Sequence, residues 1–254
     1  MGDESIEHAG ELVADVFFRT DGESWLQMIG EEQTKGEAEF IKKELGVSPP
    51  AKILDVPCGG GRHSLTLAAA GFQMTGVDIS ADMLKAARSS GASRKLSVVW
   101  EQRDSRDLPW PQQFDGAFCF GNSFGYYDDS GNAEFLKAVA AALKPGAKFI
   151  LDTGALMEGI LFSFQERNWY QIGNIKFLRN ARYDPPSSRI ETEYTLIRDG
   201  QTETKSALHR IFTYRELCEL VTNAGFTDVH GYGGLNREPF VLGSKRLLLV
   251  ATKH

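Results

Sequence analysis

The sequence is short of cysteine, and this shortage argues against two classes of protein. Its three cysteines stand at positions 58, 119 and 218 of 254 residues, and no Cys-x-x-Cys pair is present. Three scattered thiols support neither a disulfide framework nor a zinc site of the usual spacing. We therefore expect reduced thiols, no metal and a cytoplasmic location.

Long apolar runs and an excess of positive charge are also lacking. The longest apolar stretches, such as 247–251, fall far below the ~18 residues that a membrane helix needs. The segment 1–11 is acidic, whereas a signal peptide starts with cationic residues. Lys and Arg total 28 against 34 Asp and Glu, a net charge of −6, so nucleic acid is not an expected partner either.

What is present is ordinary globular composition, with 42% apolar and 24% charged residues, in a length that suits one large domain or one domain with an insertion. Short apolar strands alternate with segments of helical period. The strands are 52–56, 73–79, 96–102, 114–120 and one beginning at 149, and the helices are 61–70, 80–90 (closed by Gly91) and 130–143. This alternation predicts a doubly wound α/β fold, with a mostly parallel sheet covered by helices on both faces.

The N-terminal segment predicts helices alone. Apolar residues recur at helical spacing over 12–17, and a capping box at Thr34 and Glu37 predicts the start of a second helix that ends at Gly46. We therefore expect a helical cap over residues 1–50.

A later segment predicts antiparallel strands. The pattern indicates strands at 172–183, 190–198 and 202–212, and the Asp199-Gly200 pair between the last two is a strong hairpin signal. A second capping box, at Thr213 and Glu216, then opens a helix that is followed by strands 226–232 and 246–252. The sequence therefore predicts an α/β core over 51–160 and 213–254, with an antiparallel β insertion at 161–212.

A glycine-rich segment joins the first strand of this core to the next helix. It reads Asp55-Val56-Pro57-Cys58-Gly59-Gly60-Gly61-Arg62-His63. Glycines let the backbone turn sharply and approach a ligand, and a helix N-terminus offers N–H groups to a carboxylate or phosphate. Taken alone, the glycines are equally consistent with a tight turn that binds nothing.

Two acidic residues favour a ligand. Asp78 ends the second strand, where its carboxylate can accept both hydroxyls of a ribose, and Asp104 with Ser105 follows the third strand, where an adenine edge would lie. Because neighbouring parallel strands end in one crevice, these features together predict a nucleoside-like ligand. A nicotinamide fingerprint would need Gly or Ala where Ser64 stands, and no P-loop motif is present.

These residues resemble the class I S-adenosylmethionine-dependent methyltransferases over roughly 37–153 and 213–254. The resemblance rests on the glycine-rich segment and on Gly76-Val77-Asp78-Ile79-Ser80, Arg103-Asp104-Ser105-Arg106-Asp107-Leu108, Phe114-Asp115-Gly116-Ala117 and Leu143-Lys144-Pro145-Gly146. It implies a Rossmann-like methyltransferase fold and S-adenosyl-L-methionine as cofactor.

The resemblance also implies the cofactor residues. In the family the glycine loop embraces the methionine part, the second-strand acid holds the ribose, and the third acid with its neighbour contacts adenine. The residues that it implies here are Asp55, Pro57, Gly59, Gly61, Asp78, Ile79, Asp104, Ser105, Gly121 and Asn122. Pro57 departs from the usual pattern, which has Gly at that position.

The acceptor pocket is predicted less directly. In the family the loop after the fourth strand lies beside the transferred methyl group, so Asn122, Tyr126 and Tyr127 are candidates for the pocket. The loop lacks the Asn/Asp-Pro-Pro-Tyr/Phe/Trp motif of DNA and protein-glutamine amino methyltransferases, which disfavours nucleobase and amide nitrogens. His209 is a candidate base and Arg210 a candidate site for an acidic substrate, although cross-strand structural roles explain both.

Other residues have two explanations each. His63 suits a structural contact or a contact to the cofactor carboxylate. The apolar residues of the N-terminal segment could form a lid or simply bury a helix; these are Phe17, Phe18, Trp25 and Met28.

The sequence thus predicts an S-adenosylmethionine-dependent methyltransferase that acts on a small molecule, with the acceptor atom and a homodimer through the insertion left open. An RNA or protein methyltransferase, a non-catalytic cofactor-binding protein and a nicotinamide oxidoreductase are the alternatives. An RNA or protein acceptor would be favoured by a basic groove built from Arg103, Arg106, Arg179, Arg182, Arg189 and Arg210.

Overall fold

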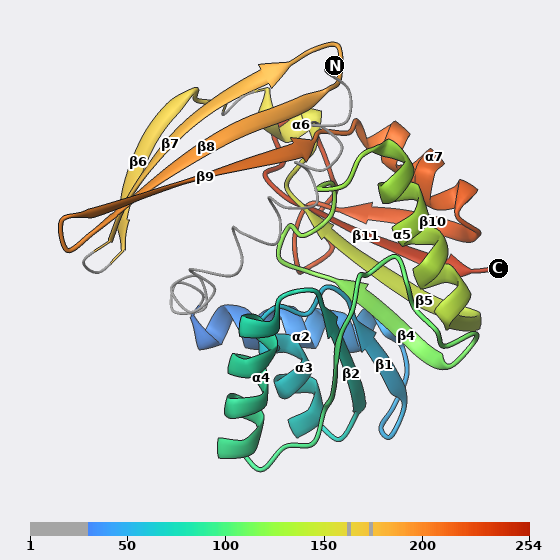
Figure 1. Cartoon of the computed structure of the whole chain (residues 1–254). Coiled ribbons are helices and arrows are strands. Elements are labelled where there is room, and N and C mark those ends of the chain that lie inside the picture. The colour runs from blue at the N-terminus through green and yellow to red at the C-terminus, as the bar shows by residue number, and fades with distance from the viewer. Residues whose placement is uncertain (1–29, 162–163, 173–174) are drawn as a thin grey trace, which may run out of the picture.

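The computed structural model describes residues 30–254 apart from 162–163 and 173–174, and it contains two sheets (Figure 1). The larger has seven strands in the order β10-β11-β5-β4-β1-β2-β3, and β11 runs antiparallel to both its neighbours. Its strands are β1 (Lys52–Asp55), β2 (Gln73–Asp78), β3 (Val99–Gln102), β4 (Phe114–Cys119), β5 (Leu143–Thr153), β10 (Phe226–Tyr232) and β11 (Leu247–Lys253). The predicted doubly wound, mostly parallel α/β fold is confirmed.

Helices cover both faces of this sheet. They are α2 (Glu31–Leu45), α3 (Arg62–Ala69), α4 (Ala81–Ser93), α5 (Asp129–Ala142) and α7 (Tyr214–Asn223), with a short α6 (Met157–Ile160) after β5. Successive strand side chains point to opposite faces, so Leu54 of β1 joins the core under α5 and α7 while Ile53 joins the core under α2 and α3. Gly116 of β4 allows this packing, because a Cβ there would meet Leu45 of α2 at 2.9 Å.

The smaller sheet is the antiparallel insertion. It comprises β6 (Arg167–Ile172), β7 (Ile175–Asp184), β8 (Arg189–Arg198) and β9 (Gln201–Arg210), paired in that order, and it projects from the core in Figure 1. Asp199 and Gly200 take φ values of 50° and 78° in the β8–β9 turn, as a two-residue hairpin with this dipeptide favours. The insertion and its hairpin are confirmed, while the proposed domain boundaries remain a prediction.

Three local predictions are wrong, those of the start of α2, the end of α4 and the start of β5, and one strand was missed. Strand β6 was not predicted, because an edge strand need not be apolar on both faces. Helix α2 begins at Glu31 with Gly30 as N-cap; Thr34 lies inside it and its hydroxyl donates to the Gly30 carbonyl at 3.4 Å. Acidic residues at positions 31 and 32 favour the helix N-terminus, so the helix starts one turn earlier than the capping box suggested.

Gly91 does not end α4 as predicted. The helix continues to Ser93, and a Cβ on Gly91 would meet Leu65 of α3 at 3.3 Å, so this glycine serves close packing. Strand β5 likewise begins at Leu143, directly after α5, and not near 149, because Leu143 pairs with Phe114. The capping box of α7 at Thr213 and Glu216 is confirmed.

The expected helix over 12–17 and the four candidate lid residues between 17 and 28 lie outside the described residues. None of the helices that the structure describes is long and apolar enough to cross a membrane.

Candidate functional site

The strand order creates a crevice at the carboxyl ends of β1 and β4. From β1 the chain proceeds to β2 and β3 on one side, while β4 and β5 lie on the other side. Ligands of open α/β sheets bind at such a switch point, outside the carboxyl ends of the strands. The loops after β1, β2, β3 and β4 carry most of the residues that the sequence singled out.

The glycine loop forms one wall of the crevice. Gly59 and Gly61 take left-handed φ values of 52° and 75°, and a Cβ on Gly61 would lie 2.3 Å from the Trp100 ring, so only glycine fits there. The Cys58 amide donates to the Val77 carbonyl at 2.8 Å, which ties the loop to the end of β2.

Asp78 is joined directly to this loop. Its Oδ2 accepts a hydrogen bond from the Gly59 amide at 2.7 Å and its Oδ1 accepts one from the Ser80 amide at 2.9 Å. The carboxylate is buried, and the neighbouring Ile79 is 41% exposed. The structure therefore brings Gly59, Asp78 and Ile79 together at the carboxyl ends of β1 and β2.

Asp104 lies at the end of the adjacent strand, because the Arg103 amide donates to the Asp78 carbonyl at 3.0 Å. Arg106 donates to Asp104 from its backbone amide at 2.8 Å and from its guanidinium at 2.7 Å. Burial alone would raise the pKa of Asp104, but the bonds from Arg106 outweigh it and lower the pKa. Tyr127 shares a 2.9 Å hydrogen bond with the buried Ser105 and faces this acid.

Asp55 lies at the base of the loop and is almost completely buried. Its Oδ2 accepts a hydrogen bond from the Ser64 hydroxyl at 2.7 Å. Burial, with the nearby charge of Asp78 as a smaller contribution, raises the pKa of Asp55 to about 7 despite the Ser64 hydrogen bond. Pro57 follows, half-buried, in the same loop.

A buried ion network supports the crevice from behind, and the sequence did not indicate it. Arg246 donates to Glu37 of α2 at 2.8 Å and to Asp152 of β5 at 2.6 Å. Asp152 in turn accepts from the Gly121 amide at 2.9 Å, which fixes the loop after β4. His63 is buried at 2.9 Å from Glu37, which favours its structural explanation.

Glu37 is ionised within this network. Burial alone would raise its pKa, but the hydrogen bond with His63 and the charges of Arg62 and Arg246 together lower the pKa far below its usual range. Arg246 and Glu37 lie 209 positions apart in sequence, so no local pattern could have revealed the role of Arg246.

A cavity of about 250 Å³ adjoins Asn122, between the ends of β4 and β5 and the face of the insertion. The lining residues are Asn122, Tyr126, Gly154, Ala155, Ile160, Phe164, Gln165, Asn168, Arg179, Ile190, Thr192, Tyr194, Ala207, His209 and Ile211. Of the predicted pocket residues, Asn122, Tyr126 and His209 line this cavity. Tyr127 does not, because it faces Asp104 and Ser105 instead.

The Asn122 side chain is held in place. Its Oδ1 accepts from the Gly154 amide at 2.8 Å and from the Thr153 hydroxyl at 3.1 Å, which leaves its amide NH₂ as the group available to a ligand. Asn122 also has φ of 59°, a conformation that asparagine tolerates. It stands where the crevice and the cavity meet.

His209 and Tyr126 form the wall beside Asn122. Their rings stack with centroids 4.4 Å apart, and His209 Nε2 donates to the Phe124 carbonyl at 2.6 Å. Burial, aided slightly by the charge of Arg189, lowers the pKa of His209 to about 4. The imidazole is therefore neutral at pH 7 and a weak base.

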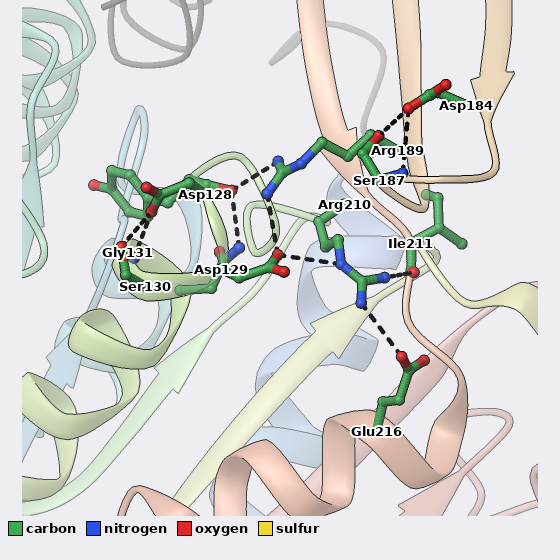
Figure 2. Close-up of polar contacts among 12 residues, drawn as sticks. Asp128, Asp129, Ser130, Gly131, Asp184, Ser187, Arg189, Arg210, Ile211 and Glu216 are labelled. Carbon is green, nitrogen blue, oxygen red and sulfur yellow. Dashed lines mark hydrogen bonds and ion pairs between the residues drawn. The ribbon is translucent and has the colours of Figure 1, made fainter. Parts of the chain in front are cut away.

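Arg210 is not part of the cavity wall, contrary to the role considered for it. Figure 2 shows it joining β9 to two helices: Nε donates to Asp129 at 3.2 Å and Nη2 to Glu216 at 3.3 Å. Arg189 of β8 donates to the same Asp129 at 3.1 Å (Figure 2). Since α5 offers this carboxylate at its N-terminus, the two arginines anchor the insertion to the core.

The crevice fits an adenosine-like group. The Asp78 carboxylate at the end of β2 can accept ribose hydroxyls, the exposed Ile79 offers an apolar surface to a purine, and Asp104 with Ser105 lies after the adjacent strand, where the purine edge would be.

Comparisons with known proteins agree with this fit. Residues 53–146 match the family model described as a methyltransferase domain. The chain is 28% identical over 224 residues to the glycine/sarcosine N-methyltransferase of Halorhodospira halochloris, covering 83% of this chain and 79% of that protein.

Two solved structures show the same fold. The CcbJ methyltransferase from Streptomyces caelestis superposes with a TM-score of 0.80 at 16% identity, covering 95% of this chain and 99% of that one. The S-adenosylmethionine-bound CalS10, an amino pentose methyltransferase from Micromonospora echinaspora, gives 0.63 at 21% identity, covering 88% and 91%.

Proposed function

Because the chain carries a class I S-adenosylmethionine-dependent methyltransferase domain, we propose that it methylates a small molecule bound in the cavity beside Asn122. The observation that carries this proposal is the position of Asn122, which lies next to the Gly121–Asp152 contact of the crevice and also lines the cavity. An acceptor in the cavity would therefore lie next to a cofactor in the crevice.

The cofactor supplies an activated methyl group when bound. The residues that would hold it are the ten named from the sequence. Within this set Asp78 would accept hydrogen bonds from the ribose, Ile79 would pack on the purine, and Asp104 with Ser105 would lie at its edge. Their existing bonds to Gly59, Ser80, Arg106 and Tyr127 fix these groups before binding, which lowers the cost of ordering the site.

The chain's part in the reaction is alignment and the exclusion of water. Alignment of two reactants contributes roughly 7–11 kcal/mol to catalysis. His209 is the titratable imidazole in the cavity wall, and with a pKa of about 4 it would remove a proton poorly. The site therefore suits an acceptor that needs little help from a base, such as a neutral amine, and the name of the Halorhodospira relative also points to nitrogen.

The ion pairs that the arginines form favour a small acceptor over RNA. A basic groove would need them free, but Arg103 pairs with Asp107, Arg106 with Asp104, and Arg182 with Glu191. Arg189 and Arg210 both pair with Asp129. Such pairing removes most of the positive potential that a phosphate backbone requires.

Two measurements test the proposal. Calorimetry should show binding of S-adenosylhomocysteine, and the protein should transfer label from methyl-labelled S-adenosylmethionine to members of a panel of small amines, phenols and thiols. Binding without transfer to any member would instead support a non-catalytic cofactor-binding protein. Tight binding of reduced nicotinamide cofactor, with none of S-adenosylhomocysteine, would contradict the proposal at its first step.

A further inference from the structure

One fully charged side chain lines the cavity. The lining contains no Asp, Glu or Lys within the described residues, and Arg179 of β7 is its only permanent charge. His209 adds none, because it is neutral at pH 7. The cavity lining therefore carries one positive charge, although the chain as a whole carries a net charge of −6.

Arg179 lacks a carboxylate partner in the part of the chain that the structure describes. Its Nη1 donates to the Gln165 carbonyl at 2.8 Å and its guanidinium lies 6.0 Å from the Phe164 ring centroid. A guanidinium has five N–H donors in a planar fork, so most of them remain available for a ligand. Arg182, on the opposite face of the same strand, instead donates to Glu191 at 2.8 Å.

The position of Arg179 gives the cavity two chemically different ends. Arg179 pairs across the sheet with Asn168 and Tyr194, whereas His209, at the Asn122 end, pairs with Ile190. Residues 190 and 194 are four positions apart on β8, which at ~3.3 Å per residue separates these two rows by about 13 Å. One end thus offers a cation with amide side chains, and the other adjoins the cofactor loop.

We propose that Arg179 binds an anionic group of the methyl acceptor, a carboxylate or a phosphate, at the end of the cavity remote from Asn122. This inference rests on the proposed function and narrows its substrate class. Glycine, with a single carbon between its amine and its carboxylate, is much shorter than the separation of these two rows. The acceptor is therefore a longer anionic molecule, with its methyl-accepting atom near Asn122.

The test is a titration of the full chain with three matched aromatic probes: phenylacetate, phenyl phosphate and the neutral phenylacetamide. Ligand-observed NMR measures the binding of each probe. The native protein should bind at least one anion about tenfold more tightly than the amide, because a charge-assisted bidentate contact is lost with the neutral probe. The better anion identifies the group as carboxylate or phosphate.

Variants assign the effect to one side chain. Arg179→Gln should abolish the preference for the anion, and Arg179→Lys should retain part of it because it keeps the charge without the planar fork. Arg182→Gln, on the outer face of β7, is the matched control and should bind like the native protein. Equal binding of the anionic and neutral probes by the native protein, or a preference that survives in Arg179→Gln, would overturn the inference.

The labelled-methyl assay separates this inference from the proposed function. An anion preference that depends on Arg179, found without methyl transfer to any acceptor, would refute the proposed function and leave the anion site standing. Transfer to neutral acceptors at rates that Arg179→Gln does not change would refute the anion site and leave the proposed function standing.

Discussion

The crevice and the cavity beside it differ in how their charged side chains are paired. In the crevice and behind it, the carboxylates of Glu37, Asp78, Asp104 and Asp152 all accept hydrogen bonds from the protein itself. In the cavity the guanidinium of Arg179 meets only a carbonyl and a ring among the described residues. The carboxylates of the crevice thus have protein partners before a ligand binds, whereas the guanidinium in the cavity leaves a charge for the ligand to neutralise.

This difference assigns rigidity to the crevice and selectivity to the cavity. Paired buried charges fix the loops that receive a common cofactor, because a buried charge without its partner is costly. An arginine that is only half-buried tolerates the lack of a partner, so it can discriminate between acceptors at little cost in stability. Substitutions at both sites test this contrast.

Removal of Arg246 should give the largest effect. Arg246→Leu leaves the buried carboxylates of Glu37 and Asp152 with fewer partners, and we expect the free energy of unfolding to fall by about 3–5 kcal/mol in urea denaturation. The control is Arg215→Leu, whose exposed pair with Glu219 on α7 should leave the free energy of unfolding nearly unchanged. Equal losses in both variants would show that the network does not stabilise the crevice.

The buried Asp55 should make stability decline as pH rises. Its pKa of about 7 in the folded protein lies above the value of about 3.9 for an exposed Asp, so its contribution is full below about pH 4 and is lost as pH passes through 7. Asp55→Asn should remove a decline on the order of 2–4 kcal/mol between about pH 4 and about pH 8. Urea titrations across this range measure it.

Asp115 gives the opposite slope as a control. Burial opposes ionisation there, but the hydrogen bonds from the Lys144 ammonium and the Lys52 amide, with the charges of both lysines, together lower its pKa. Its contribution is therefore present above about pH 4 and lost in acid. Asp115→Asn should cost less than about 1 kcal/mol at neutral pH, because the pair is partly exposed. A decline with pH that survives in Asp55→Asn would contradict the assignment to Asp55.

Asp78→Ala should weaken binding of S-adenosylhomocysteine more than about tenfold, through loss of a charge-assisted bond pair to the ribose. Asp82→Ala, in the exposed first turn of α4, is the matched control and should leave the affinity unchanged. Calorimetry at constant ionic strength measures both. An unchanged affinity in Asp78→Ala would refute its assignment to the ribose.

His209→Gln should have the smallest effect. Loss of a general base lowers a rate by about 10²–10⁴-fold. Because an imidazole with a pKa of about 4 is a weak base and His209 serves to shape the cavity wall, we expect the rate of methyl transfer to fall less than about tenfold. The pH profile of methyl transfer above about pH 6 should keep its shape, as it should in the control His230→Gln on the exposed face of β10. A new pH dependence in His209→Gln alone would assign it a proton-transfer role.

Sequence reasoning succeeded where structure is local. The turn at Gly59 to Gly61, the carboxylate at the end of β2 and the Asp199-Gly200 hairpin each depend on a few consecutive residues. It failed where a distant contact decides, as at Gly91, which looked like a helix end but serves packing against Leu65. It considered Arg210 for an acidic ligand and did not consider Arg179 for that role, since neither residue's partner is visible in the sequence.

Local residue patterns were sufficient to specify the alternation of strands and helices, the glycine loop and the order of the acids along one sheet edge, because chain connectivity places the ends of successive parallel strands together. The pairing of the charges depends instead on tertiary packing. Arg246 meets Glu37 across 209 positions and Asp152 across 94, and Arg179 enters the cavity through the register of the insertion. Such contacts depend on how whole elements pack, which no local pattern specifies.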